Sequence, residues 1–571
     1  MENWEVSAYL QRIAELLAIK GENEYKIRSY QNASRIVSHL QERVEELVNR
    51  KELVNIKGIG AALSSKVEEM VYDGRSSLLE ELQKEVPLEL LSLFQVPGMG
   101  YKTVSRLVNH LQIENLDDLE AAAEEGLIRG VPGLGPSLEA KILKELQEKE
   151  ISGSSFHQGI AFPMAQLFLE RLREKGETGR LDIGGDLRRG ADSVSEIVLI
   201  WETSCQTEEW MEEIKKIKEV DRLLSREENQ ASFLTILGIP VRIIAVSVNY
   251  PVQLLYSTGS LHHLQQLEKR AKENGFMLDR TGLYRGAEEL TPGDETEIYS
   301  LLGLEYVPPE LREGSGEIEA AAGIGLPVLV TREDVKGDLH LHTNWSDGNS
   351  TIEDMAIQAR AKGYSYMAIT DHSVSLKIAG GLSREKVLSQ VEYIKGVRSC
   401  YPELHIFTGI EVDILTEGEL DYPEEILSRL DVVIASIHSG FKQPPDRITE
   451  RLASAVRHPA VNIIGHPTGR LIGKREPYGV DLEKIIDLAA RYGKALEINS
   501  SPDRLDLSAY NACKAAKKGV PLVTGTDAHS SGGMDDIFYG IKTARRGWLR
   551  AEQLLNTWSP DEVRDFLGCR G

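Results

Sequence analysis

The sequence predicts a multidomain protein of mixed α and α/β class, with a helical N-terminal region, an α/β middle and a C-terminal parallel β/α barrel. Three observations support this prediction. A short glycine-rich turn recurs three times among helix-like segments in the first 150 residues, and strand-like runs appear at residues 196–201, 232–237 and 241–248. From about residue 336, short apolar strands alternate with helical segments. At 571 residues the chain is too long for one hydrophobic core, so three or four domains are expected.

Composition narrows the class of protein. Apolar residues make up 41% and charged residues 27%, which is typical of a folded globular chain. There is no long uncharged apolar run, the first residues are acidic, and the four scattered cysteines form no CxxC pair. We therefore expect a cytoplasmic protein with no membrane partner, and a monomer is favoured.

The net charge of −23 argues against a surface covered in basic residues. It does not argue against nucleic-acid binding, because helix N-termini and bound cations can contact phosphates.

The recurring turn carries two glycines around one apolar residue. Its copies are residues 56–60, 96–100 and 131–135, each followed by an apolar helical segment, at residues 63–71, 104–111 and 138–146. Glycine lets the backbone turn tightly and approach another backbone. The next helix then offers free N–H groups and a positive dipole end to a phosphate. The repeat predicts helix-hairpin-helix motifs that hold the DNA backbone without reading sequence, through Gly58, Gly60, Gly98, Gly100, Gly133 and Gly135.

The strands of the C-terminal region end in residue types that bind metals. His340 and His342 lie two positions apart on a strand, so they point to the same face. Later strand-like runs end at His372, Glu411, His438, His466, Asp527 and His529. In a β/α barrel the carboxyl ends of the strands share the face that holds the active site. Imidazole and carboxylate together suit Zn²⁺, Mn²⁺ or iron, and so many ligands predict more than one ion. Such ions activate water and hold phosphate oxygens.

These residues resemble the PHP (polymerase and histidinol phosphatase) domain. The resemblance implies a distorted (β/α)7 barrel with a three-metal site, loaded with Mn²⁺ or Zn²⁺. Carried onto this sequence, it places one metal on His340, His342, Glu411 and Asp527, a second on Glu411, His438 and His466, and a third on Asp347, His372 and His529. Glu411, His438, Asp527 and Arg470 are then candidate catalytic residues, and Arg470 and Arg504 are candidates to bind phosphate.

Taken whole, the chain resembles the bacterial family X DNA polymerases, which join a polymerase-beta-like core to a PHP domain. Besides the motifs above, the resemblance rests on residues 184–190, Gly-Gly-Asp-Leu-Arg-Arg-Gly, and 256–260, Tyr-Ser-Thr-Gly-Ser. It assigns nucleotide binding to Gly185, Arg188, Arg189, Glu196, Tyr256 and Gly259. It implies a lyase-like domain with the first hairpin at residues 1–85, a fingers-like domain with further hairpins at 86–150, a palm at 151–240, the palm end and thumb at 241–315, a linker at 316–335 and the PHP domain at 336–571.

The palm departs from the family pattern at its metal-binding carboxylates. The family has Gly-Ser-x-Arg-Arg-Gly, then an Asp-x-Asp pair and a third aspartate on a later strand. Here the serine is Asp186, the pair reads Glu-Ile-Val at residues 196–198, and the third position aligns with Arg242. One carboxylate cannot hold two Mg²⁺ ions, so Mg²⁺ at the palm is doubtful and the nucleotide site is expected to be vestigial.

In the first hairpin, Lys66 falls on the position of the Schiff-base lysine of polymerase-beta-like lyase domains. A lysine near a phosphate site can attack an abasic sugar aldehyde if its amine is partly deprotonated. The alternative is an ordinary solvated lysine on a DNA-binding helix. We expect a weak lyase nucleophile at best.

The sequence as a whole predicts a DNA repair or end-processing enzyme. The expected activity is a metal-dependent 3′-to-5′ exonuclease, with abasic-site endonuclease and 3′-phosphatase activities left open, on gapped, 3′-end or abasic DNA. One alternative is an active gap-filling polymerase with PHP proofreading, which the missing palm carboxylates disfavour. Another is a small-molecule PHP phosphatase, which leaves three DNA-binding hairpins without a role.

Overall fold

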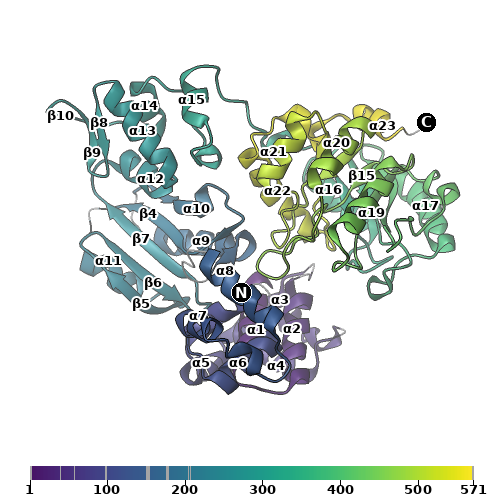
Figure 1. Cartoon of the computed structure of the whole chain (residues 1–571), viewed down its shortest axis with the longest axis horizontal. Coiled ribbons are helices and arrows are strands. Elements are labelled where there is room, and N and C mark those ends of the chain that lie inside the picture. Colours follow the sequence, from purple (N-terminus) through teal and green to yellow (C-terminus); the bar gives the residue numbers. More distant parts are fainter. Residues whose placement is uncertain are drawn as a thin grey trace. The chain divides into compact units, whose positions relative to one another are not determined.

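The computed structural model describes the chain apart from residues 1–2, 39, 41, 57, 97–98, 149–154, 175–178, 204, 206 and 569–571. The chain divides into two compact units, one of residues 1–325 with 473–475 and one of residues 326–472 with 476–571. The boundary after residue 325 lies inside the predicted linker at 316–335. The elements of both units are labelled in Figure 1.

Helices form the first part of the N-terminal unit and pack around α1 (Asn3–Ile19). Apolar side chains cover most of the circumference of α1, which is the pattern of a buried helix. Its neighbours are α2 (Glu24–Ser38), α4 (Ala61–Asp73), α5 (Ser77–Glu85) and α6 (Tyr101–Leu111). The region is completed by α3 (Val44–Asn49), α7 (Leu116–Glu124) and α8 (Pro136–Glu148).

The three glycine turns share one backbone hydrogen bond. In each, the amide of the apolar residue between the glycines donates to the carbonyl three residues earlier. These hydrogen bonds are Ile59 to Ile56 at 3.0 Å, Met99 to Val96 at 2.9 Å and Leu134 to Val131 at 3.0 Å. Helices α4, α6 and α8 begin immediately after the second glycine of the respective turn. The internal repeat seen in the sequence is therefore a repeat of structure.

A five-stranded sheet forms the middle of this unit, in the order β2-β4-β7-β6-β5. The strands are β2 (Leu181–Ile183), β4 (Ile197–Glu202), β5 (Val220–Arg226), β6 (Gln230–Thr235) and β7 (Pro240–Val246). Helices α9 (Gln158–Arg173), α10 (Gly185–Arg188) and α11 (Thr207–Ile214) belong to the same region, as does the short pair β1 (Phe156–His157) and β3 (Ser193–Val194). The sequence analysis did not identify β2 or β5, because β2 is very short and β5 is exposed and rich in charge.

The last part of the N-terminal unit holds helices α12 (Tyr250–Thr258), α13 (Leu261–Glu273) and α14 (Glu295–Leu301) and a small sheet. The sheet consists of β8 (Met277–Asp279), β9 (Gly282–Arg285) and β10 (Glu288–Leu290). The predicted linker begins with a helix, α15 (Glu317–Ala322). The buried Glu317 carboxylate accepts the amides of Gly314 and Ser315 and pairs with His263 at 2.7 Å, so this part of the linker is packed structure.

The C-terminal unit is a seven-stranded parallel sheet whose strands follow chain order. They are β11 (Gly337–Leu341), β12 (Tyr366–Ile369), β13 (His405–Asp413), β14 (Val432–Ser436), β15 (Ile463–Ile464), β16 (Ala495–Glu497) and β17 (Leu522–Val523). A bridge between Leu341 and Ala528 joins the end of the first strand to the segment after the last one. The sheet thus curls into the distorted (β/α)7 barrel that the sequence predicts.

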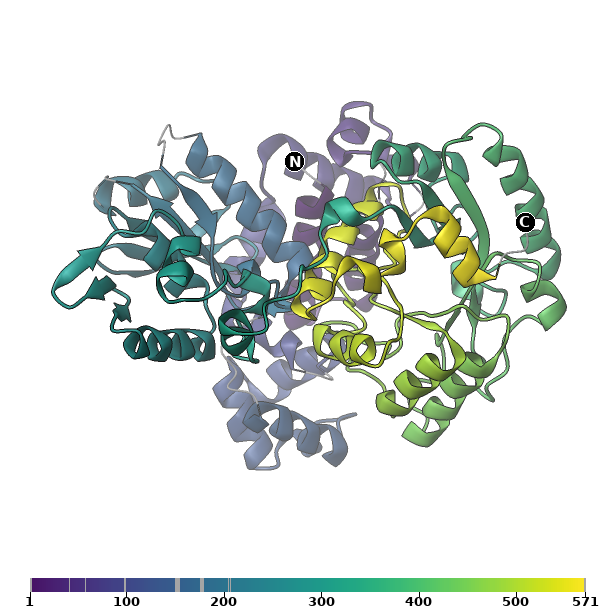
Figure 2. The same ribbon diagram turned by 90° about the horizontal axis from the view of Figure 1, so that it is seen from above.

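Apolar side chains pack on both faces of the curled sheet. Inside lie Leu339, Tyr366, Phe407, Ile434, Ile463 and Val523, together with Val563 and Leu567 of α23 (Pro560–Leu567). Outside, the other strand residues pack on the intervening helices, which Figures 1 and 2 show around the barrel. These helices are α16 (Ile352–Ala361), α17 (Arg384–Arg398), α18 (Glu424–Leu427), α19 (Pro445–Arg457), α20 (Leu482–Tyr492), α21 (Ala509–Lys517) and α22 (Ile537–Arg546). Among the described residues, no helix is both long and apolar enough to cross a bilayer.

Candidate metal centre and nucleic-acid interface

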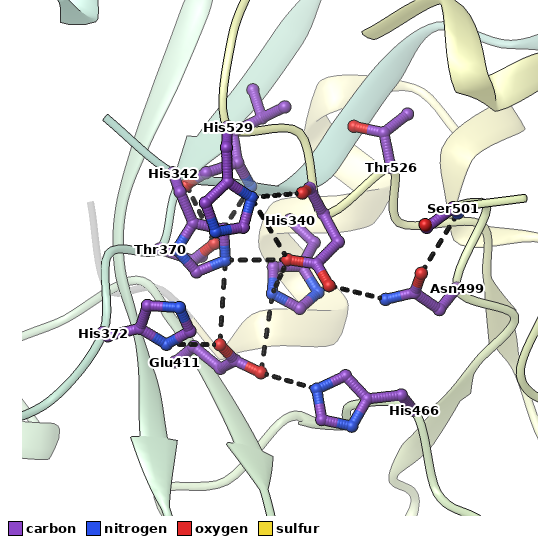
Figure 3. A network of polar contacts seen from close by, with 12 residues as sticks. His340, His342, Thr370, His372, Glu411, His466, Asn499, Ser501, Thr526 and His529 are labelled. Atoms are coloured by element: carbon purple, nitrogen blue, oxygen red, sulfur yellow. Dashed lines mark hydrogen bonds and ion pairs between the residues drawn. The ribbon is translucent and has the colours of Figure 1, made fainter. Parts of the chain in front are cut away.

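The nine side chains predicted to bind metals come together at the carboxyl edge of the barrel. They lie at or just after the ends of β11, β12, β14, β15 and β17, in the loop after β11, and on β13. Figure 3 shows several of their side chains pointing into one site. The barrel brings together residues up to 189 positions apart (His340 to His529), because the ends of successive parallel strands share one edge.

Glu411 on β13 lies at the centre of this cluster and is 1% exposed. Its two carboxylate oxygens lie 2.8–3.7 Å from ring nitrogens of five histidines, namely His340, His342, His372, His438 and His466. A carboxylate with neighbours on every side can bridge two ions. This geometry fits the shared position that the family resemblance gives to Glu411.

Two aspartates complete the cluster on the side of β11 and β17. Asp527 Oδ1 lies 3.1 Å from His342 Nε2 and 3.7 Å from His340 Nε2. Asp347 Oδ1 lies 3.2 Å from His529 Nε2 and 3.6 Å from His372 Nε2. Each aspartate therefore pairs with two histidines, as in the first and third metal sites of the resemblance.

Eight of the nine residues fall into three groups compact enough to hold ions, while His466, predicted for the second metal, lies 3.0 Å from Glu411 Oε1 but belongs to none of these groups. Within each group, ligand atoms lie within 4.8 Å of one another: His342, Asp347, His372 and His529; His340, His342 and Asp527; and His372, Glu411 and His438. Several of these atoms are buried without a hydrogen-bond partner, including His340 Nε2, both ring nitrogens of His342, and Glu411 Oε2. Buried polar atoms are normally paired. Unpaired donors that converge in this way fit metal ions, although each residue's role as a ligand stays a prediction.

Charge in the site is divided between neutral and protonated imidazoles. Burial, with His372 and His529 nearby, lowers the pKa of His342 to about 3. Burial opposes protonation of His438, but Glu411 and Asp413 outweigh it and raise the pKa of His438 to about 10. In the same way, Asp347 and Asp527 overcome burial and raise the pKa of His529 to about 9. Metal binding to such a site displaces protons from the histidines.

Two candidate ligands have left-handed backbones, which are uncommon for residues other than glycine. His466 has φ of 26° and Asp527 has φ of 56°. Backbone strain of this kind is retained mainly at functional sites, where it fixes the direction of a side chain. Here it aims a histidine and a carboxylate into the site.

The two candidate phosphate-binding arginines have different positions. Arg504 Nε lies 3.6 Å from Asp527 Oδ2, so its guanidinium is at the edge of the cluster. Arg470 instead donates to the carbonyl of Arg504 at 2.8 Å and to that of Leu505. Arg470 thus supports the loop that carries Arg504, and a direct phosphate contact by Arg470 stays a prediction.

The predicted DNA-binding glycines differ in their surroundings, and their contact with DNA stays a prediction. A Cβ added at Gly60, Gly100 or Gly135 would meet no atom within 4 Å, so these positions open to solvent. Gly58 and Gly133 have left-handed φ of +100° and +79°. Gly98 lies outside the described residues. Lys66 on α4 forms an ion pair with Glu69 at 3.1 Å.

The palm residues form two separate clusters. Arg242 on β7 lies opposite Val198 on β4, and its guanidinium pairs with the Glu196 carboxylate at 2.7 Å. At the two positions predicted to correspond to the family's other aspartates, this chain therefore has a valine and an arginine. The other residues predicted to bind a nucleotide lie at α10 and around the end of α12. Arg188 pairs with Glu295 at 2.7 Å. Arg189 pairs with Asp186 and Glu313 and donates to the carbonyls of Thr258 and Gly259. Gly185 begins α10, and Tyr256 donates to Glu268 at 2.8 Å.

The sequence analysis missed several residues that contact the cluster. Glu497 pairs with His340 and Asp413 pairs with His438, while the Asn499 side chain donates to Asp527 at 3.1 Å. Glu497 ends the apolar strand β16, so the rule that identified the histidines would have identified it too. Asp413 also ends a strand, but it lies two residues after Glu411, which the sequence analysis took as the end of that strand.

Comparison with known proteins matches four segments of the chain to family models. Sequence profiles match a helix-hairpin-helix domain at residues 1–76, a SAM-like helix-hairpin-helix tandem at 89–148, a DNA polymerase beta thumb at 253–313 and a PHP domain at 338–501. Probable phosphatases of Thermoanaerobacter sp. (strain X514) and Shewanella oneidensis are 36% and 34% identical to the chain. They align with 40% and 41% of it and with 93% and 92% of their own lengths.

One relative matches over the full length of the chain. The DNA polymerase/3′-5′ exonuclease PolX of Bacillus subtilis (strain 168) is 34% identical over 572 aligned residues, which cover 99% of both chains. The match includes the helical hairpins, the polymerase-like middle and the metal cluster together. The chain therefore belongs to the bacterial family X DNA polymerases that carry a C-terminal PHP domain.

Proposed function

We propose that this protein is a metal-dependent 3′-to-5′ exonuclease that processes DNA ends in the bacterial cytoplasm. The observation that carries the proposal is the cluster of nine candidate metal-ligand side chains around Glu411, all of them buried or half-buried except Asp347. The helix-hairpin-helix domains imply DNA as the partner, and the Bacillus subtilis relative is named for an exonuclease. Abasic-site incision and removal of a 3′-phosphate would use the same centre.

The residues fit Mn²⁺ or Zn²⁺, which would be held by the six histidines and by Asp347, Glu411 and Asp527. When bound, such ions supply an activated water and neutralise phosphate oxygens. The chain itself contributes orientation and charge. Arg504, whose Nε lies 3.6 Å from Asp527 Oδ2, would bind a phosphate oxygen, Arg470 holds the Arg504 loop, and Glu411, with histidines next to both of its oxygens, would contribute to two of the metal sites.

The polymerase core is proposed to hold DNA without extending it. Nucleotide transfer by two metals needs carboxylates that bridge ions roughly 3.5–4 Å apart. The Glu196 carboxylate is instead neutralised by Arg242, and Val198 offers no ligand. The arginines of the Gly-Gly-Asp-Leu-Arg-Arg-Gly segment are paired with Asp186, Glu295 and Glu313, so their charge is met by the protein's own carboxylates.

The test is an assay of the purified protein on a labelled 3′-recessed duplex with Mn²⁺, with and without dNTPs. We expect shortening of the labelled strand in both conditions and no extension. Glu196→Gln is the matched control, because it changes an acid of the palm and leaves the PHP cluster intact, and its exonuclease rate should be unchanged. Robust extension that is lost in Glu196→Gln would show an active polymerase instead.

The probable-phosphatase relatives favour one further candidate, a PHP phosphatase that acts on small phosphomonoesters. Assays of the same protein preparation on the labelled duplex and on p-nitrophenyl phosphate distinguish the two activities. Hydrolysis of the small ester without degradation of DNA ends would favour the phosphatase. The three open glycine turns favour the DNA substrate.

A further inference from the structure

Two buried carboxylates outside the nine-residue cluster contact its histidines from behind. Glu497, at the end of β16, is 0% exposed, and its Oε1 lies 2.6 Å from His340 Nδ1. Asp413, at the end of β13, is 5% exposed, and its Oδ1 lies 2.5 Å from His438 Nδ1. In both histidines Nε2 is the nitrogen that faces Glu411.

We propose that Glu497 is a positioning residue that sets the tautomer and direction of His340 and thereby raises the affinity of the site for its metals, with Asp413 doing the same for His438. A proton on Nδ1 that is donated to a carboxylate leaves Nε2 with a free lone pair for an ion. Carboxylates in this position behind a ligand histidine commonly tune metal affinity. This inference rests on the proposed function of the site.

Glu497 also connects two strands of the centre. Its Oε2 accepts the backbone amide of His466 at 2.6 Å, and the Asn499 side chain donates to the same oxygen at 3.3 Å. The other hydrogen of the Asn499 amide group is available to Asp527, whose Oδ2 lies 3.1 Å away. One carboxylate therefore fixes His340 directly, His466 through its backbone, and Asp527 through Asn499.

The space around Glu497 is fitted to its carboxylate. A Cβ added at Gly525 would lie 2.2 Å from Glu497 Oε1, so the absence of a side chain there leaves room for the acid next to His340. All the close partners of the two oxygens are donors: an imidazole, a backbone amide and a side-chain amide. Glutamine in this position would present its NH₂ group to one of these donors.

The test is Glu497→Gln in the full-length protein, with metal affinity as the readout. Apparent dissociation constants for Mn²⁺ and Zn²⁺ are measured by competition with a chromogenic chelator. We expect about 10- to 100-fold weaker binding, the range usual for partners of metal-bound histidines. The melting temperature in EDTA reports the structural cost of the substitution separately. Asp413→Asn should give a similar loss of affinity.

Asp338→Asn is the matched control. Asp338 is equally buried on β11 and accepts from the Thr526 hydroxyl at 2.5 Å and from the backbone amide of His340, but it touches no imidazole ring. Its variant should change metal affinity less than about threefold, because Asp338 contacts His340 only through the backbone amide, which an asparagine oxygen can still accept, and no ring nitrogen loses its partner. Unchanged affinity in Glu497→Gln, or an equal loss in Asp338→Asn, would overturn the proposal. A wild-type protein that binds no metal would instead overturn the proposed function.

Discussion

Removal of the Glu411 charge is the sharpest perturbation of the proposed centre. Glu411→Gln keeps the shape of the side chain but leaves five histidines without the carboxylate that lies 2.8–3.7 Å from their nitrogens. The loss of one such fixed group at a reacting phosphate costs about 100- to 1,000-fold in rate. That loss corresponds to about 3–4 kcal/mol of activation free energy. We expect the exonuclease rate to fall by at least this factor.

The assay pairs a rate with a binding signal. The rate is the initial shortening of a labelled 3′-recessed duplex in saturating Mn²⁺. The binding signal is the metal-dependent rise in stability, which is about 2.7 kcal/mol when the free ion is at 100 times its dissociation constant. Wild type should show both signals and Glu411→Gln neither. A variant that keeps its rate within tenfold and its stabilisation by Mn²⁺ would refute the placement of the metals around Glu411.

Four further predictions concern the N-terminal unit. Gly100→Ala should weaken DNA binding at fixed salt with little change in melting temperature, because its Cβ enters open space. Gly58→Ala, with φ of +100° and a Cβ 2.5 Å from Ile36 Cδ1, should lower stability by about 1–3 kcal/mol. Borohydride should trap little or no adduct on an incised abasic duplex, and a strong adduct lost in Lys66→Ala would contradict this. Although burial raises the pKa of Glu295, Arg312 and Arg188 lower it to about 2, so Glu295 stabilises the fold above pH 4.5 and loses this effect as pH falls toward 2. Glu295→Gln should therefore cost about 3 kcal/mol in denaturant unfolding at pH 7 and less at pH 3.

Eight of the nine candidate ligands were predictable from sequence because each has a local signature, whereas Asp347, in the loop after β11, was assigned only through the family resemblance. An apolar strand followed by histidine or a carboxylate identifies a residue at the carboxyl edge of a barrel without knowledge of its partners. The same rule would mark Glu497 only as a possible ligand, and the contacts of Glu497 and Arg470 could not be predicted from it. Glu497 contacts His340, 157 residues away, and Arg470 contacts the carbonyl of Arg504, 34 residues away. Such pairings follow from the closure of the barrel, which no local pattern specifies.

The palm-like sheet shows how a fold can be retained when the residues needed for its usual activity are absent. Its sheet depends on the alternate residues that face the core: Ile197, Leu199 and Ile243 are fully buried. Among the positions that would carry catalytic carboxylates, Val198 faces the other side of the sheet and is buried with Ile200 and Ile244. Glu196, just before β4, and Arg242 remain about one-third exposed. Exchange of an acid for arginine there costs little packing and forms an ion pair. The fold therefore survives loss of the metal-binding carboxylates, and membership of a polymerase family does not decide whether this palm transfers nucleotides.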